Sequence, residues 1–105
     1  MTDLTHQARA LAALGHEARL RVFRLLVRAG PEGLPVGEIG RHLGLAPSTL
    51  AHHLSALVDA RLVRQERRGR LVVNSVDFDA TRALVTFLTS ECCTGLEAVP
   101  SEAAA

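Results

Sequence analysis

Apolar residues recur every three or four positions along most of the first sixty residues, which is the spacing of amphipathic helices. The pattern predicts four helices, separated by breaks that contain glycine or proline. The expected ranges are 4–14, 16–29, 36–43 and 46–60. In the last of them, Leu50, Leu54 and Leu57 share one face, which we expect to be buried. Two short helices joined by a tight turn at Gly44 are typical of a helix-turn-helix.

The hydrophobic pattern changes after the fourth helix. Residues 62–67 and 70–76 are predicted to form two strands, with Arg68–Gly69 between them as the turn of a tight hairpin. A hairpin directly after a helix-turn-helix is much more specific than either part alone, and it predicts the wing of a winged helix-turn-helix. The expected fold is therefore mainly α, with about five helices and a two-stranded β-hairpin wing.

A fifth helix is predicted to follow the wing, capped by Asp77 or Asp79 and extending to about Cys92. A three-helix core with a wing can close on itself, so the apolar stripes of the first and last helices need another partner. These stripes contain Leu4, Ala8, Leu11 and Ala12 in the first helix and Leu84, Val85 and Leu88 in the last. Burying both stripes against a second copy predicts a homodimer, which suits a two-fold DNA site.

The length of 105 residues is enough for one domain, expected over residues 1–95, with a flexible tail over residues 96–105. Apolar residues make up 48% of the chain, so a core is possible, built from Leu, Val and Ala. No apolar run reaches the ~18 residues of a membrane span. The N-terminus lacks the residue order of a signal peptide, so we expect a cytoplasmic protein with no membrane partner.

The net charge of +1 says little about nucleic acid, but the distribution of arginine says more. All twelve basic residues are Arg, and five of them fall within residues 61–70, where Glu66 is the only acid. A solvated charged hairpin is the plainer interpretation. The position in a wing favours DNA instead, because Arg67, Arg68 and Arg70 can reach phosphates or a narrow minor groove there.

The fourth predicted helix is the candidate recognition helix. If its leucines face the core, the residues that face outward are Ser48, Thr49, His52 and Ser55. Such side chains can contact base edges or phosphates in a major groove, although Ser48 and Thr49 are also suited to capping the helix. We interpret His53 as a satisfied structural histidine. Arg41 and His42 are further candidates for phosphate contacts.

Two segments resemble the ArsR/SmtB family of dimeric metal-sensing repressors: ALGHEARLRVFRLL, and VGEIGRHLGLAPSTLAHHLSALVDARLVRQERRGR. The resemblance covers roughly residues 11–87 and departs mildly at Ala60–Arg61, where the family usually has Ala-Gly. It implies a repressor that an inducer releases from double-stranded operator DNA. One family sensing site needs thiols where this chain has Pro35 and Gly37, and another needs histidines on the last helix, which has none.

The remaining soft donors are Cys92 and Cys93, which resemble the sensing pair of another arsenic-responsive branch. That branch often has a third cysteine, which this chain lacks. Thiolates suit trivalent arsenic, and a monomethylated arsenical needs only two of them. The pair therefore favours organic arsenicals such as methylarsenite, while arsenite or antimonite with a third ligand from glutathione or water stays open. No resident cofactor is required, and incidental thiols are the plainer interpretation.

Four other functions compete with that of a metalloid-responsive repressor. A thiol redox switch is disfavoured because such switches usually use cysteines that are far apart in sequence, and a repressor with no metal inducer stays open. A winged helix used only for protein contacts is disfavoured by the arginine-rich hairpin. An enzyme is not expected, because the sequence has no Gly-rich phosphate loop and no defensible Ser/His/Asp set.

Overall fold

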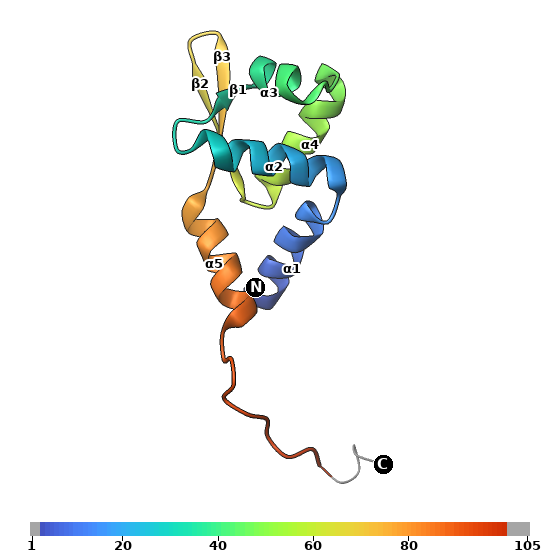
Figure 1. Cartoon of the computed structure of the whole chain (residues 1–105), viewed down its shortest axis with the longest axis vertical. Helices are drawn as coiled ribbons and strands as arrows, with labels where there is room; N and C mark the ends of the chain where they lie inside the picture. Colours follow the sequence, from blue (N-terminus) through green and yellow to red (C-terminus); the bar gives the residue numbers. More distant parts are fainter. Residues whose placement is uncertain (1–2, 101–105) are drawn as a thin grey trace.

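The computed structural model describes residues 3–100 and consists of a small helical body with a β-hairpin that projects from it (Figure 1). None of the described helices is both long and apolar enough to cross a membrane. The helices are α1 (Asp3–Leu14), α2 (Glu17–Ala29), α3 (Val36–Leu43), α4 (Pro47–Asp59) and α5 (Phe78–Thr89), and the strands are β1 (Leu34–Pro35), β2 (Val63–Arg68) and β3 (Leu71–Val76). The predicted winged helix-turn-helix fold is confirmed.

The core lies where α2, α3 and α4 meet the base of the sheet. Leu50, Leu54 and Leu57 are almost completely buried, as their spacing predicted. They belong to one cluster with Leu26 of α2 and Ile39 of α3. Burying a leucine side chain contributes about 1.5–3 kcal/mol, so this cluster holds α4 at a fixed rotation about its own axis.

The turn between α3 and α4 follows from its local sequence. Gly44 ends α3 with a left-handed backbone (φ 65°), and its N–H donates to the carbonyl of Gly40 at 2.8 Å. Glycine suits this position because it has no Cβ to clash. Pro47 then occupies the first turn of α4, where the absence of an N–H costs nothing.

The sheet has three strands in the order β1-β3-β2, rather than the two that the sequence predicted. Pro35 pairs with Val73, and Leu34 pairs with Asn74. A two-residue strand that contains proline has no alternating pattern to detect. Gly33 makes the pairing possible, because a Cβ at this position would lie 2.2 Å from the carbonyl oxygen of Asn74.

The wing is a regular antiparallel hairpin in which Arg68 pairs with Leu71. The turn residues are therefore Gly69 and Arg70, one position later than predicted. Gly69 has a φ of 62°, and a positive φ at the first turn residue is what a tight hairpin of this kind requires.

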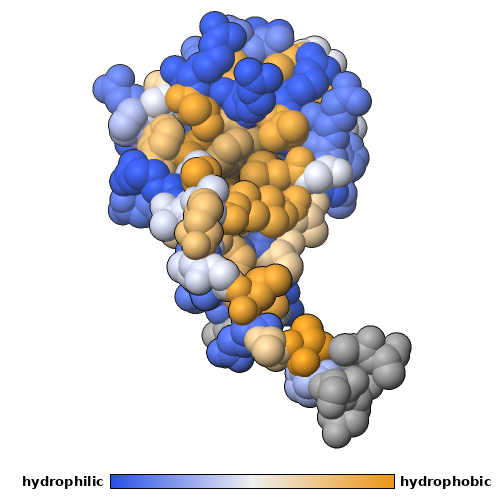
Figure 2. All heavy atoms as spheres, turned by 60° about the horizontal axis from the view of Figure 1, so that its bottom comes forward, coloured by the Kyte–Doolittle hydropathy of each residue, from blue (hydrophilic) through white to orange (hydrophobic). Residues whose placement is uncertain are grey.

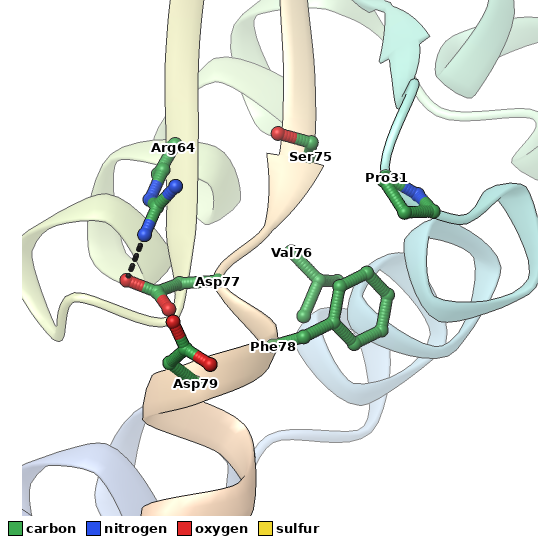
Figure 3. Close-up of a pocket in the computed structure, with 7 residues that line it drawn as sticks. All are labelled: Pro31, Arg64, Ser75, Val76, Asp77, Phe78 and Asp79. Carbon is green, nitrogen blue, oxygen red and sulfur yellow. Dashed lines mark ion pairs between the residues drawn. The ribbon is translucent and has the colours of Figure 1, made fainter.

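Asp77, rather than Asp79, caps α5 and joins it to the wing (Figure 3). Its Oδ1 accepts a hydrogen bond from the N–H of Ala80 at 2.9 Å, and its Oδ2 lies 3.2 Å from a guanidinium nitrogen of Arg64 in β2. The N–H of Asp77 also donates to the carbonyl of Leu62 at 2.9 Å. The hydrogen bond from Ala80 lowers the pKa of Asp77 most, and Arg64 lowers it further.

The prediction that the last helix extends to Cys92 is wrong, because α5 ends at Thr89. Ser90 adopts an extended backbone, and its hydroxyl donates to the carbonyl of Phe87 at 2.9 Å. The Thr89 hydroxyl lies 3.3 Å from the carbonyl of Val85. Consecutive Thr and Ser side chains thus compete for the backbone groups that would continue the helix.

The first and last helices extend from the body on the side opposite the wing tip (Figure 1). Viewed from that end, apolar surface gathers over them (Figure 2). Leu11 is 40% exposed, Val85 59% and Leu88 57%, whereas Leu84 is buried against the core. Residues 94–100 form no helix or strand.

We expect Asp77→Ala to lower the free energy of unfolding by about 1 kcal/mol, because α5 loses its N-cap and β2 loses the partner of Arg64. Asp77→Asn should lose less, since an amide oxygen can still cap. Urea unfolding at one protein concentration measures both. The difference between wild type and Asp77→Asn should shrink below about pH 4, where the carboxylate of the unfolded chain takes up its proton. Equal stability of wild type and Asp77→Ala would contradict the assigned cap.

Candidate DNA-binding surface and thiol pair

The exposed face of α4 carries the residues that the sequence selected for base contacts. Ser48, Thr49, His52 and Ser55 are all exposed, on the side away from the buried leucines. Helix α4 has no side-chain hydrogen bond at its N-cap, which is Ala46. Capping by Ser48 or Thr49 is therefore not what the structure shows, and both hydroxyls are free to bind another molecule.

The wing lies beside this face of α4. A cavity of about 360 Å³ separates them, lined by Ala51 and Ser55 of α4 and by Gln65 and Val72 of the hairpin, among others. The side-chain amide of Gln65 donates to Oδ1 of buried Asn74 at 2.8 Å, which ties the two wing strands together on this side. One of the recognition-helix candidates, Ser55, therefore shares a cavity with the hairpin.

The candidate arginines differ in how far their charge is already balanced. Arg68 is paired with Glu66 at 2.5 Å, and Arg41 lies 4.0 Å from Glu38. Arg67 and Arg70 are exposed and form no ion pair within residues 3–100. We expect these two to contribute most to a phosphate contact, because their charge is unshared.

His53 is buried as predicted, but it is not satisfied. The residue is only 5% exposed, and its Nδ1 has no hydrogen-bond partner among the described residues. Its ring centroid lies 5.0 Å from that of His16 and 5.8 Å from that of His52. Burial lowers the pKa of His53, and the nearby His16, Arg19 and His52 lower it further.

The sequence pattern did not reveal the roles of His16 and Arg19. Nδ1 of His16 caps α2 by accepting a hydrogen bond from the N–H of Ala18 at 3.2 Å. Arg19 lies in the first turn of α2, and its Nε is buried without a partner in the described part of the chain. The one available signal was a polar residue at the start of a predicted helix, which is compatible with a cap but does not reveal the contact with α4.

Cys92 and Cys93 lie in a tight turn after α5, and both are exposed free thiols. Their sulfur atoms are 2.8 Å apart. Glu91 and Cys93 both have left-handed backbones, with φ of 62° and 65°. Such conformations are costly for residues other than glycine and recur at functional sites.

Hydrogen bonds hold this turn together. The N–H of Cys92 donates to the carbonyl of Thr89 at 3.1 Å, and the N–H of Thr94 donates to the carbonyl of Glu91 at 3.2 Å. The contact with Cys93 raises the pKa of Cys92. Within residues 3–100, no three His, Cys, Asp or Glu side chains are grouped so that they could hold a metal ion. The turn thus offers two sulfur donors to one ligand atom.

A model of the helix-turn-helix domain family matches residues 14–66, which include the whole helix-turn-helix and most of β2. The chain belongs to this family. It is also 29% identical over 86 residues to the HTH-type transcriptional regulator YgaV of Escherichia coli (strain K12), covering 82% of this chain and 85% of that protein.

Solved structures confirm the ArsR-like fold. An ArsR-like transcriptional regulator from Rhodococcus sp. RHA1 aligns with a TM-score of 0.72 at 22% identity, over 81% of this chain and 77% of that one. A possible transcriptional regulator for arsenical resistance aligns with a TM-score of 0.67 at 25% identity, over 77% and 81%. These similar proteins are regulators rather than enzymes.

We expect replacement of Arg67, Arg68 and Arg70 by Gln to weaken binding similarly on all DNA sequences. The slope of log affinity against log salt should fall by about 0.9 for each phosphate that each protomer no longer neutralises. Arg82→Gln is the control, because Arg82 is exposed on α5 and pairs with Asp79. An unchanged slope in the triple variant would refute the wing assignment.

Changing Ser48 or His52 should have a different effect from changing the wing. These side chains lie on the exposed face of α4, so removing them should alter which operator sequences are preferred. Selection of DNA from a random pool by wild type and by each variant measures the preference. Identical selected sequences would show that α4 does not read bases through these side chains.

Proposed function

We propose that this ArsR-like regulator is a homodimeric repressor that binds operator DNA through α4 and the wing and is released by a trivalent arsenical at Cys92 and Cys93. The observation that carries the inducer assignment is the pair of exposed thiols with sulfurs 2.8 Å apart. The observation that supports DNA binding is the exposure of the α4 hydroxyls together with wing arginines, Arg67 and Arg70, that form no ion pair within residues 3–100.

The dimer is proposed to form through α1 and α5. Both helices leave large apolar side chains in water, including Leu4, Leu11, Val85 and Leu88. These residues belong to the two helices over which apolar surface gathers (Figure 2). An exposed apolar patch at helical spacing is the expected sign of a protein interface, and a second copy supplies the same patch.

The ligand chemistry of the thiol pair favours trivalent arsenic. Soft ions select thiolates, and two sulfurs already side by side form a chelate without much rearrangement. Two thiolates complete the coordination of a monomethylated arsenical, whose third position is carbon. Arsenite or antimonite would need a third ligand, such as water or glutathione. The similarity to a possible regulator for arsenical resistance agrees with this ligand class.

The thiol protons are balanced by the leaving groups of the arsenical. The contact with Cys93 raises the pKa of Cys92, so the thiol form is favoured at neutral pH. As each sulfur binds arsenic, its proton leaves with one hydroxyl group of the hydrated arsenical as water, so the two sulfurs of the pair displace two hydroxyl groups without net proton release. Affinity for the arsenical should therefore change little with pH while both thiols are protonated.

A thiol-based redox response is the second candidate, and it is suggested by the same short contact between the sulfurs of Cys92 and Cys93. An oxidant would have to remove two electrons and two protons from the pair, and the disulfide formed would close a ring between neighbouring residues. Such a bond is strained, because the Cβ vectors of neighbours normally diverge. This geometry favours an external ligand over a disulfide.

We expect Leu88→Asp to break the dimer and abolish operator binding, because it places a charge in the proposed interface. Val27→Asp is a matched control. Val27 is 40% exposed, as is Leu11 of the proposed interface, but it lies on α2, outside that interface. Analytical ultracentrifugation at micromolar concentration measures assembly. A monomeric wild type, or a dimeric Leu88→Asp variant, would contradict the interface.

The inducer is tested by release of labelled operator. Methylarsenite should release wild-type protein at least as well as arsenite does, whereas Cys92→Ser and Cys93→Ser should bind operator normally and fail to respond. Glu91→Gln is the control for the nearest carboxylate in the sequence and should respond like wild type if two thiolates suffice.

Normal release of the double Cys→Ser variant would refute the proposed sensor. Release of wild type by peroxide or polysulfide without any arsenical effect would select the redox function. A response to arsenite but not to methylarsenite would retain the site and reverse the ligand preference.

A further inference from the structure

Four nitrogen-bearing side chains meet where the start of α2 crosses α4. His16 directly precedes α2, Arg19 lies in its first turn, and His52 and His53 are neighbours on α4. The ring of His53 is within 6 Å of the other two imidazoles, at 5.0 and 5.8 Å. Neither the sequence pattern nor the proposed contacts of α4 account for this cluster.

The cluster has donors but no acidic partner. Within residues 3–100, no carboxylate lies within ion-pair distance of any of the four side chains. Nε of Arg19 and Nδ1 of His53 are both buried without a hydrogen-bond partner in that part of the chain. Unpaired buried polar atoms are costly, and native proteins usually satisfy them with a partner, a water or a ligand.

The position of the cluster indicates which anion would satisfy it. His52 is exposed on the same face of α4 as Ser48 and Ser55, and exposed His16 lies beside the N-terminus of α2. A helix N-terminus carries a partial positive charge and favours phosphate. A DNA strand that passes over α4 would bring its backbone within reach of both exposed imidazoles.

We propose that His16 and Arg19 form a binding site for one phosphate of the DNA backbone, next to the base-reading side chain of His52, with His53 behind it as a proton-accepting positioning residue. This rests on the proposed DNA-binding function and adds a contact that neither α4 alone nor the wing provides. The buried imidazole of His53 lies against both exposed imidazoles, with ring centroids 5.0 Å from His16 and 5.8 Å from His52. When the phosphate arrives, its negative charge favours protonation of His53.

The charges around His53 determine the direction of the effect. In the free protein, burial and the neighbouring His16, Arg19 and His52 lower its pKa, so the ring is neutral at pH 7. The DNA backbone brings negative charge, and a phosphate held by His16 and Arg19 is the part of it nearest His53, so it raises the pKa of His53 in the complex. The complex thus binds more protons than the separate molecules, and DNA affinity rises as pH falls between the two values.

The test is the pKa of His53 in free and DNA-bound protein, measured from the imidazole carbon-proton NMR signals of the full chain. We expect the pKa of His53 to be higher in the complex with operator DNA than in the free protein. The same shift should occur with a non-operator duplex, because a phosphate contact does not depend on base sequence. An unchanged His53 pKa on bound DNA would overturn the proposal.

Variants give a second readout. Wild-type affinity for DNA at constant ionic strength should rise by up to about tenfold per pH unit for each proton taken up. In His53→Gln, the slope of log affinity against pH should be smaller than in wild type by the contribution of about one proton. His6→Gln, on α1, should keep the wild-type slope. A His53→Gln variant that keeps the wild-type slope would also overturn the proposal. If wild type binds no DNA at any pH, the proposed function itself fails, which separates the two ideas.

Discussion

The burial of one leucine face of α4 is the constraint on which the rest of the structure depends. Leu50, Leu54 and Leu57 have almost no contact with water, and together their burial contributes several kcal/mol. Turning α4 by half a turn would expose all three and bury Ser48 and Ser55 instead. The rotation of the recognition helix, and hence every DNA contact proposed for it, is therefore set by the core.

The spacing of apolar residues at every three or four positions made the fold predictable from the sequence. Helix positions, the turn at Gly44 and the exposed hydroxyls of α4 all follow from a spacing that repeats along each helix. Features set by two or three residues were not predictable. Strand β1 is too short to show an alternation, and the end of α5 is decided by hydroxyl groups that bond back to the helix at Thr89 and Ser90.

In the candidate site too, some features follow from a repeating spacing and others depend on a few residues. Exposure of His52 follows from periodicity, because solvent-facing positions of a helix are the complement of the buried ones. The wing arginines are instead exposed because the hairpin projects from the body, and β2 shows no alternation of burial after Val63. The contact of His53 with His16 joins residues that are 37 positions apart in the sequence, across two helices, and no local pattern encodes it. The 2.8 Å approach of the two sulfurs likewise depends on left-handed backbones at Glu91 and Cys93, which no propensity of these residue types predicts.

The end of α5 changes how the proposed inducer would act. A thiol pair inside a helix would release DNA by unwinding it, but Cys92 and Cys93 already lie outside α5. Chelation would instead stiffen a strained turn that begins directly after Leu88 and Thr89, next to the apolar face proposed for the dimer. The other end of α5 is tied to the wing through Asp77 and Arg64 (Figure 3). A coupling of about 1–3 kcal/mol is typical of such regulation. In the proposed dimer, a shift of α5 between these two ends would be the way to change how the two wings are spaced.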